Sequence, residues 1–243
     1  MAAVDPVPSD RGPAGWYGKL ASLGDFAQRR LPPHWVRHCD PWLAGLMREL
    51  PRELGPRWLD TYLTAPVLRF AWAPGVVDMR WWFGVLMPSC DNVGRYFPLL
   101  IAQSRVHPAL DRAALEHLER WYAAVAHAAL RTLGDGVALE SFEQALAAAP
   151  AWPMAAPPPA APQADGSWQS FSAPTSRWRD ALPQLAAGEL LERLAGCTLW
   201  SPALAPPTAA ALRWGPGLPS AERLAPMLQA VTPSAPPPTL QSR

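Results

Sequence analysis

The chain has 243 residues, of which 49% are hydrophobic and 17% charged, a composition typical of a globular protein with one sizeable core. Its net charge of +1 excludes the strong basic field that binding to nucleic acid or anionic lipid requires. The three cysteines form no CxxC pair, and no His/Cys cluster has zinc spacing. We therefore expect a protein of the reducing cytoplasm, with no metal ion, no cofactor and no membrane insertion.

The N-terminal part predicts a short strand followed by two helices. Residues 1–14 lack a basic segment followed by an apolar one, so we expect a disordered leader rather than a signal peptide. "GWYGKL", residues 15–20, is typical of a short strand. Asp40 and Pro41 are suited to the N-cap and first position of a helix through Leu50. A second helix is expected from near Pro56 to just before Pro66.

The hydrophobic period then changes from 3.6 to 2, which predicts three strands close together in sequence. Leu68, Phe70 and Trp72 alternate with other residues, as in a half-buried strand. "WWFGVLM", residues 81–87, has no polar gap and predicts a central strand covered on both faces, with Trp81 and Trp82 pointing to opposite sides. With a third strand at 97–103, these form an antiparallel meander.

The second half of the chain predicts further helices, a linker and two late strands. Two short strands cannot form a core of their own, so we expect the late strands to join the same sheet. The proline- and alanine-rich segment is typical of a semi-rigid linker. In chain order, the expected elements are helices at 111–133 and 139–146, the linker at 150–175, a helix at 182–194, strands at 197–201 and 210–214, a helix at 220–229 and a disordered tail at 231–243.

Strands that occur in runs, without strict alternation of strand and helix, favour the α+β class. We predict a single, mostly antiparallel sheet flanked by helices on its faces, an αβα-like sandwich. The domain is expected to span residues 15–230, interrupted by the linker.

The loop "PSCDNVGRY", residues 88–96, carries the side chains that most resemble a site. A catalytic serine at Ser89 would require a GxSxG turn and a histidine base, and neither motif is present. A structured loop is the better interpretation, with Gly94 permitting positive φ. Arg95 between buried strands needs a partner carboxylate, and Asp91 and Asp25 are the candidates.

The stretch "WYGKLASLGDF" raises a similar question. Lys19 and Gly24 weakly suggest a phosphate cradle, but GxxxxGK[ST] is absent, and a tight connection after a strand is favoured. Two classes of function remain open from the residues. One is a non-enzymatic binding module. The alternative is a small-ligand sensor or enzyme that uses a cleft formed by Lys19, Asp25 and Arg95.

These blocks together resemble the TagF (ImpM) family of type VI secretion system-associated proteins. "GWYGKLASLGDFAQRRLP" is similar to its opening signature, "WFGVLMPSCDNVGRYFPLLI" to its central motif, and "CTLWSPAL" with "LRWGPGLPSAERLAPML" to its tail blocks. The resemblance covers roughly residues 15–230. It departs from the family pattern at Asn92, where arginine is expected, and at Ser201, after Trp200.

The resemblance implies a cytoplasmic accessory protein, not an enzyme, that represses type VI secretion after translation. The partner it implies is a forkhead-associated scaffold protein of the secretion system. The candidate motif and recognition residues carried by the matching blocks are Lys19, Gly24, Asp25, Phe26, Ser89, Asp91, Gly94 and Arg95.

Overall fold

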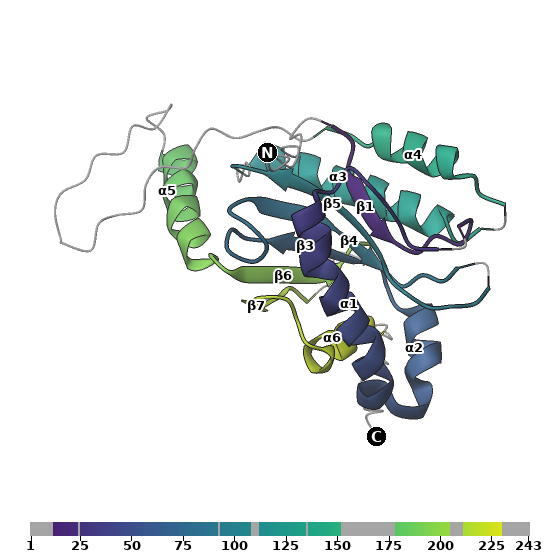
Figure 1. Ribbon diagram of the computed structural model, residues 1–243. Coiled ribbons are helices and arrows are strands. Elements are labelled where there is room, and N and C mark those ends of the chain that lie inside the picture. Colours follow the sequence, from purple (N-terminus) through teal and green to yellow (C-terminus); the bar gives the residue numbers. More distant parts are fainter. Residues whose placement is uncertain are drawn as a thin grey trace, which may run out of the picture.

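The computed structural model describes residues 12–23, 25–91, 93–107, 112–134, 136–151, 178–204 and 211–229. At its centre lies a seven-stranded sheet in the order β2-β1-β5-β4-β3-β6-β7, in which every neighbouring pair is antiparallel (Figure 1). The strands are β1 (Gly15–Gly18), β2 (Ala27–Arg29), β3 (Leu68–Trp72), β4 (Trp81–Met87), β5 (Leu99–Arg105), β6 (Cys197–Pro202) and β7 (Arg213–Pro216). The helices are α1 (Pro33–Leu54), a 3-10 turn η1 (Gly55–Arg57), α2 (Trp58–Thr64), α3 (Arg112–Arg131), α4 (Leu139–Ala147), α5 (Trp178–Arg193) and α6 (Ala221–Leu228).

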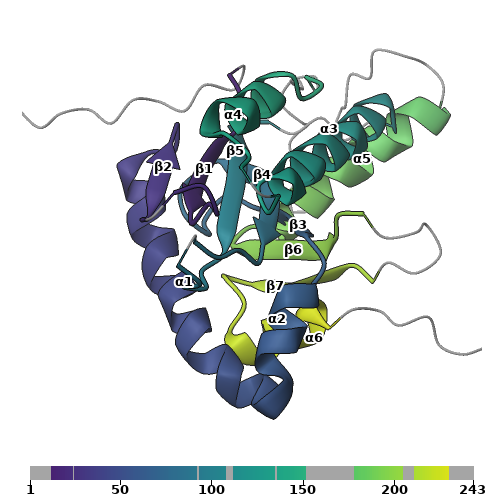
Figure 2. The ribbon, with the colours of Figure 1, turned by 90° about the vertical axis from the view of Figure 1, so that its right-hand side faces the viewer.

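Helices cover both faces of the sheet, which confirms the predicted α+β class (Figure 2). Side chains of β4 alternate between two hydrophobic clusters. Trp81, Phe83 and Val85 pack in the cluster that includes α3 and α4, whereas Trp82 and Leu86 pack in the one that includes α1 and α6. The uninterrupted apolar run of this strand is therefore explained by burial on both sides.

Helix α1 begins earlier than the sequence predicted. It starts at Pro33, in the first-turn position that suits proline, and contains Pro41, which we had placed at the helix start. The helix tolerates Pro41 because that residue is exposed and only one backbone bond is lost. A buried stripe at intervals of three and four residues, formed by Trp35, Cys39, Leu43, Leu46 and Leu50, holds α1 on the sheet.

The late strands behave as predicted, because β6 and β7 extend the same sheet beyond β3. Strand β2 was not predicted; its three residues Ala27–Arg29 have no apolar alternation. The last residue of the predicted leader, Ala14, is buried in the hydrophobic cluster that includes α3 and α4. Residues 1–11 of the leader, the linker from residue 152 on and the tail 231–243 lie outside the described residues.

Within the part of the chain that the structure describes, none of the helices combines the length and the apolar character needed to cross a membrane.

Candidate functional site

The end of β1 lies directly beneath the loop between β4 and β5. Gly18 has φ 134°, and a β-carbon there would lie 2.1 Å from the Pro98 carbonyl oxygen, so only glycine fits this close approach. The next residue, Lys19, is thereby placed below the loop, where its backbone carbonyl accepts a hydrogen bond of 2.9 Å from Ser89 Oγ.

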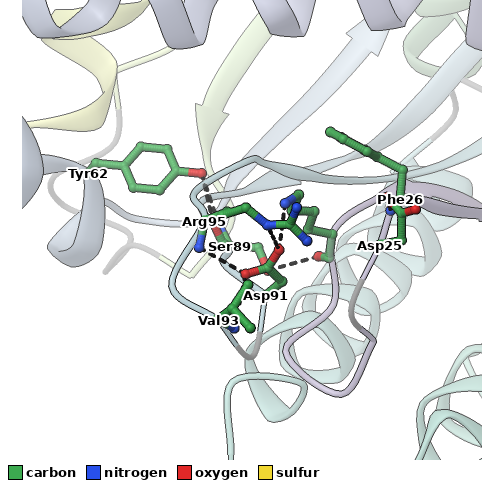
Figure 3. Close-up of polar contacts among 8 residues, drawn as sticks. Asp25, Phe26, Tyr62, Ser89, Asp91, Val93 and Arg95 are labelled. Atoms are coloured by element: carbon green, nitrogen blue, oxygen red, sulfur yellow. Dashed lines mark hydrogen bonds and ion pairs between the residues drawn. The ribbon is translucent and has the colours of Figure 1, made fainter.

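The carboxylate of Asp91 is the centre of the site (Figure 3). Its Oδ2 atom accepts hydrogen bonds from Lys19 Nζ at 2.6 Å and from Arg95 Nε at 2.7 Å. Its Oδ1 atom accepts backbone N–H bonds from Arg95 at 2.8 Å and Val93 at 3.1 Å. We call the three side chains Lys19, Asp91 and Arg95 the latch.

Burial and charge differ sharply among the latch residues. The side chains of Lys19 and Asp91 are 5% and 0% exposed, whereas that of Arg95 is 59% exposed. Removal from water would by itself raise the pKa of Asp91, but the hydrogen bonds from Lys19 and Arg95 and the backbone outweigh it. The pKa of this carboxyl therefore lies well below the usual range, and Asp91 is an anion that holds two cations.

The backbone of the loop closes around the same carboxylate. Asp91 N–H donates to the Arg95 carbonyl and Gly94 N–H to the Asp91 carbonyl, each at 3.1 Å. Gly94 has φ 77°, as predicted for the glycine of this turn. Cys90 and Tyr96 form an isolated antiparallel bridge at the base of the turn. These bonds close the loop as the end of a hairpin.

Ser89 has a structural role in this arrangement. Its hydroxyl donates to the Lys19 carbonyl, and its backbone N–H donates to the hydroxyl of Tyr62 at 3.1 Å. The Tyr62 hydroxyl in turn donates to the Ser89 carbonyl, also at 3.1 Å. Burial raises the pKa of Tyr62, which keeps its phenol protonated as a donor.

The structure decides between the two carboxylates predicted as partners of Arg95. Asp91 is the partner, which confirms that expectation. Asp25 is not, because its carboxylate accepts the Phe26 N–H at 2.7 Å and lies apart from Asp91 (Figure 3). The separation follows from the chain path: Asp25 lies on the connection to β2 and not in the loop above Lys19. Gly24 lies outside the described residues.

Apolar side chains are exposed around the latch. Phe26 is 47% exposed. The centroid of its ring lies 5.1 Å from Lys19 Nζ and 4.6 Å from the centroid of the Phe97 ring, which it contacts edge to face. Val93, at the tip of the loop, is also exposed. We call Phe26, Val93 and Arg95 the rim. A fixed loop with exposed apolar and cationic side chains is suited to contact with another protein.

A second carboxylate, which contacts the β1–β2 hairpin, was missed by the sequence analysis. Glu143 of α4 accepts a hydrogen bond from Trp16 Nε1 at 2.5 Å and forms an ion pair with Arg30 at 2.5 Å. Burial opposes its charged form, but these bonds hold the pKa of Glu143 below its usual value. The partners are more than a hundred residues apart, so no local pattern could have revealed them.

Within the described ranges, no group of three or more His, Cys, Asp or Glu side chains is placed to hold a metal ion. The fold and site thus define an α+β protein whose candidate site is a buried ion cluster under a β-hairpin loop.

The comparisons with known proteins then give the family. The profile described as "TagF N-terminal domain, Type VI secretion system-associated" matches residues 15–149, and the chain therefore belongs to the TagF family. Among solved structures, PA0076 from Pseudomonas aeruginosa PAO1 is similar, with 37% sequence identity and a TM-score of 0.71. The match covers 92% of this chain and 97% of that one. No curated protein matches the chain. Membership of this family supports an accessory role in type VI secretion.

Proposed function

We propose that this protein acts in the cytoplasm as a post-translational repressor of type VI secretion, and that it does so by binding a forkhead-associated scaffold protein. Family membership supports the accessory role. The partner and the repression rest on the resemblance of the motifs, and the site supports a binding mechanism rather than catalysis.

One observation carries the preference for binding: the charged groups of the site are used within the chain. Lys19 and Arg95 both contact Asp91 Oδ2. The cleft envisaged for a sensor or enzyme required Lys19, Asp25 and Arg95 to converge, and Asp25 does not join them. A cluster satisfied in this way serves to fix the loop, while the rim offers the contact surface.

The test measures binding of the purified full chain to the forkhead-associated scaffold of the same secretion system. Val93→Glu places an unpaired charge in the proposed interface, and we expect it to weaken binding by about 100-fold, as for a central contact residue. Met79→Glu is the matched control, because Met79 is exposed in the turn between β3 and β4, outside the rim. It should bind like the wild type.

The cellular readout is secretion of a type VI substrate by a strain lacking the gene. Wild type and Met79→Glu should restore repression, whereas Val93→Glu should not. If Val93→Glu binds the scaffold and represses like the wild type, the rim is not the contact surface. If Cys90→Ala abolishes repression while the protein folds and binds normally, the loop is a reactive site and the binding mechanism is wrong.

A further inference from the structure

The sheet ends on β7. Edge strands are usually protected from pairing with another chain by charged side chains, proline, bulges or a covering segment, whereas β7 carries an exposed tryptophan. Among the described residues, β7 pairs with β6 on one side only (Figure 1). The side chains along it are exposed, and Trp214 is 67% exposed at the middle of the strand. A large aromatic side chain on an open sheet edge is typical of a contact surface.

The hydrogen-bonding direction of β7 follows from the ladder with β6. Gly217 N–H donates to the Gly196 carbonyl at 2.8 Å, one step beyond the paired residues. Bonded and non-bonded pairs alternate along an antiparallel ladder, so Thr198 with Gly215 is a bonded pair and Leu199 with Trp214 is not. The N–H and carbonyl of Trp214 therefore point away from β6, toward the open edge.

The other side of β6 agrees with this assignment. Ala73 N–H donates to the Cys197 carbonyl at 3.0 Å, so the carbonyl of Cys197, like the backbone groups of Leu199 two residues later, faces β3. Thr198 and Trp200 are left to bond β7.

Gly215 adds an independent observation. A β-carbon built at Gly215 would meet no atom within 4 Å, and its φ is not in the left-handed region. Neither packing within the chain nor backbone strain therefore requires glycine there. Glycine inside a strand often marks the close approach of another backbone.

We propose that β7 is the interface through which two copies of this chain pair, edge to edge and antiparallel, with the two-fold axis at Trp214. In this register Trp214 N–H donates to the Trp214 carbonyl of the second copy, and the reverse bond forms by symmetry. The two indoles lie opposite each other on one face of the joined sheet and cover each other.

The flanking residues are compatible with this two-fold pairing. Leu212 N–H faces the Pro216 carbonyl of the second copy and can donate to it. Proline has no N–H, so the Leu212 carbonyl at the exposed end of the strand has no donor from the second copy. Arg213 falls opposite Gly215, not opposite another arginine, so no like charges meet and the open space at Gly215 receives the arginine side chain. The edge is self-complementary, which favours a second copy over a different protein.

The experiment is sedimentation equilibrium of the full chain over a wide range of concentration. We expect a dimer that dissociates on dilution. Trp214→Pro removes the outward N–H and the indole without breaking a bond to β6, and should raise the dimer Kd by about 100-fold. Met79→Glu, at a position that is 81% exposed in the turn between β3 and β4 and outside β7, should dimerise like the wild type.

A charge pair at Gly215 gives a test that does not depend on the folding of Trp214→Pro. Gly215→Glu faces Arg213 of the second copy and should lower the Kd, whereas Gly215→Arg should raise it, with about tenfold between the two variants. A wild-type chain that stays monomeric throughout would overturn the proposal, and so would a well-folded Trp214→Pro that dimerises normally. Gly215 variants that shift the Kd in the same direction would also overturn it.

Discussion

Two carboxylates tie the N-terminal hairpin to the rest of the protein, and they do so in different surroundings. Asp91 lies inside a loop, is fully enclosed and accepts four hydrogen bonds, two of them from backbone N–H groups. Glu143 lies on α4 and remains 16% exposed; among the described residues, it accepts hydrogen bonds from the side chains of Trp16 and Arg30, and its Oε1 atom lies 3.9 Å from Arg29 Nη1.

The comparison shows that local structure depends more strongly on the ion pair at Asp91 than on the one at Glu143. At Asp91 the protein has replaced water completely, so loss of one partner leaves a buried charge behind. At Glu143 water remains available to the carboxylate and to Arg30, so a lost bond is partly replaced. Short hydrogen bonds at both carboxylates therefore do not imply equal contributions to stability.

The largest expected effect comes from removing the buried cation of the latch. Lys19→Met keeps the side-chain volume but leaves Asp91 buried with a weaker set of donors. We expect the free energy of unfolding to fall by about 3–5 kcal/mol, measured by urea denaturation. Arg37→Met, at an exposed position of α1, is the control and should change stability by less than about 0.5 kcal/mol. Equal losses in the two variants would contradict a buried pair.

The next effect is a dependence of stability on acid. The pKa of Asp91 is lower in the folded state than its unfolded value of about 3.9. The folded state therefore binds fewer protons, and the stability from this group is present above about pH 4 and lost as pH falls through the folded pKa. Asp91→Asn lacks this titrating group. Its free energy of unfolding should be lower than that of the wild type at neutral pH, and the difference should shrink below about pH 4. A deficit that stays constant in urea titrations from neutral to acid pH would show that Asp91 is not the titrating group.

A smaller effect is expected at the partly exposed carboxylate of Glu143. Glu143→Gln preserves an acceptor for Trp16 but removes the charge that pairs with Arg30, and should cost about 1 kcal/mol. A double-mutant cycle with Arg30→Gln isolates the pair, and its coupling energy should be well below the cost of Lys19→Met. A coupling energy as large as that cost would mean that exposure does not distinguish the two sites.

The smallest effect on stability is expected at the exposed end of the latch itself. Arg95→Met removes a bond of 2.7 Å to the same oxygen that Lys19 contacts, yet its side chain is mostly in water. We expect a loss below about 1 kcal/mol by thermal unfolding. Binding to the scaffold should nevertheless weaken, because Arg95 belongs to the rim. If Arg95→Met were as unstable as Lys19→Met, the latch would depend on both cations equally.

The sequence predicted the parts of this site that are local. Arg95 and Asp91 are four residues apart in a loop that buried strands enclose, so charge and spacing made Asp91 one of the two candidate partners, with Asp25. Lys19 comes from β1, and its approach to Asp91 depends on β1 pairing with β5, which no local pattern shows. The buried role therefore belongs to Lys19, which the residues alone placed with Asp25 and Arg95 in a possible ligand cleft.

Errors in the fold have a similar origin. Strand periodicity located the meander and β6 to within two residues, because burial of side chains leaves a visible mark in the sequence. β7 joins the sheet as expected, but it spans Arg213–Pro216 instead of 210–214, and its side chains are mostly exposed. The start of α1 was misplaced because Pro41 was interpreted as a first-turn proline, whereas tertiary packing of Trp35 and Cys39 holds the helix through it. Strand β2 exists because β1 offers it a partner, and not because of its own side chains.

The order of strands in the sheet also has a consequence for the route to the folded state. The central β3–β4–β5 meander pairs residues close in sequence, whereas Leu68 of β3 meets Pro202 of β6 from the far part of the chain. Closing that long loop lowers the entropy of the chain before contacts between β3 and β6 stabilise it. We expect the meander to nucleate and β6–β7 to dock last, so amides of β4 should gain protection in pulsed hydrogen exchange before those of β6. The edge strand β7, which carries Trp214, would then form only after the core. The proposed dimer interface would therefore be absent from the early folding intermediates.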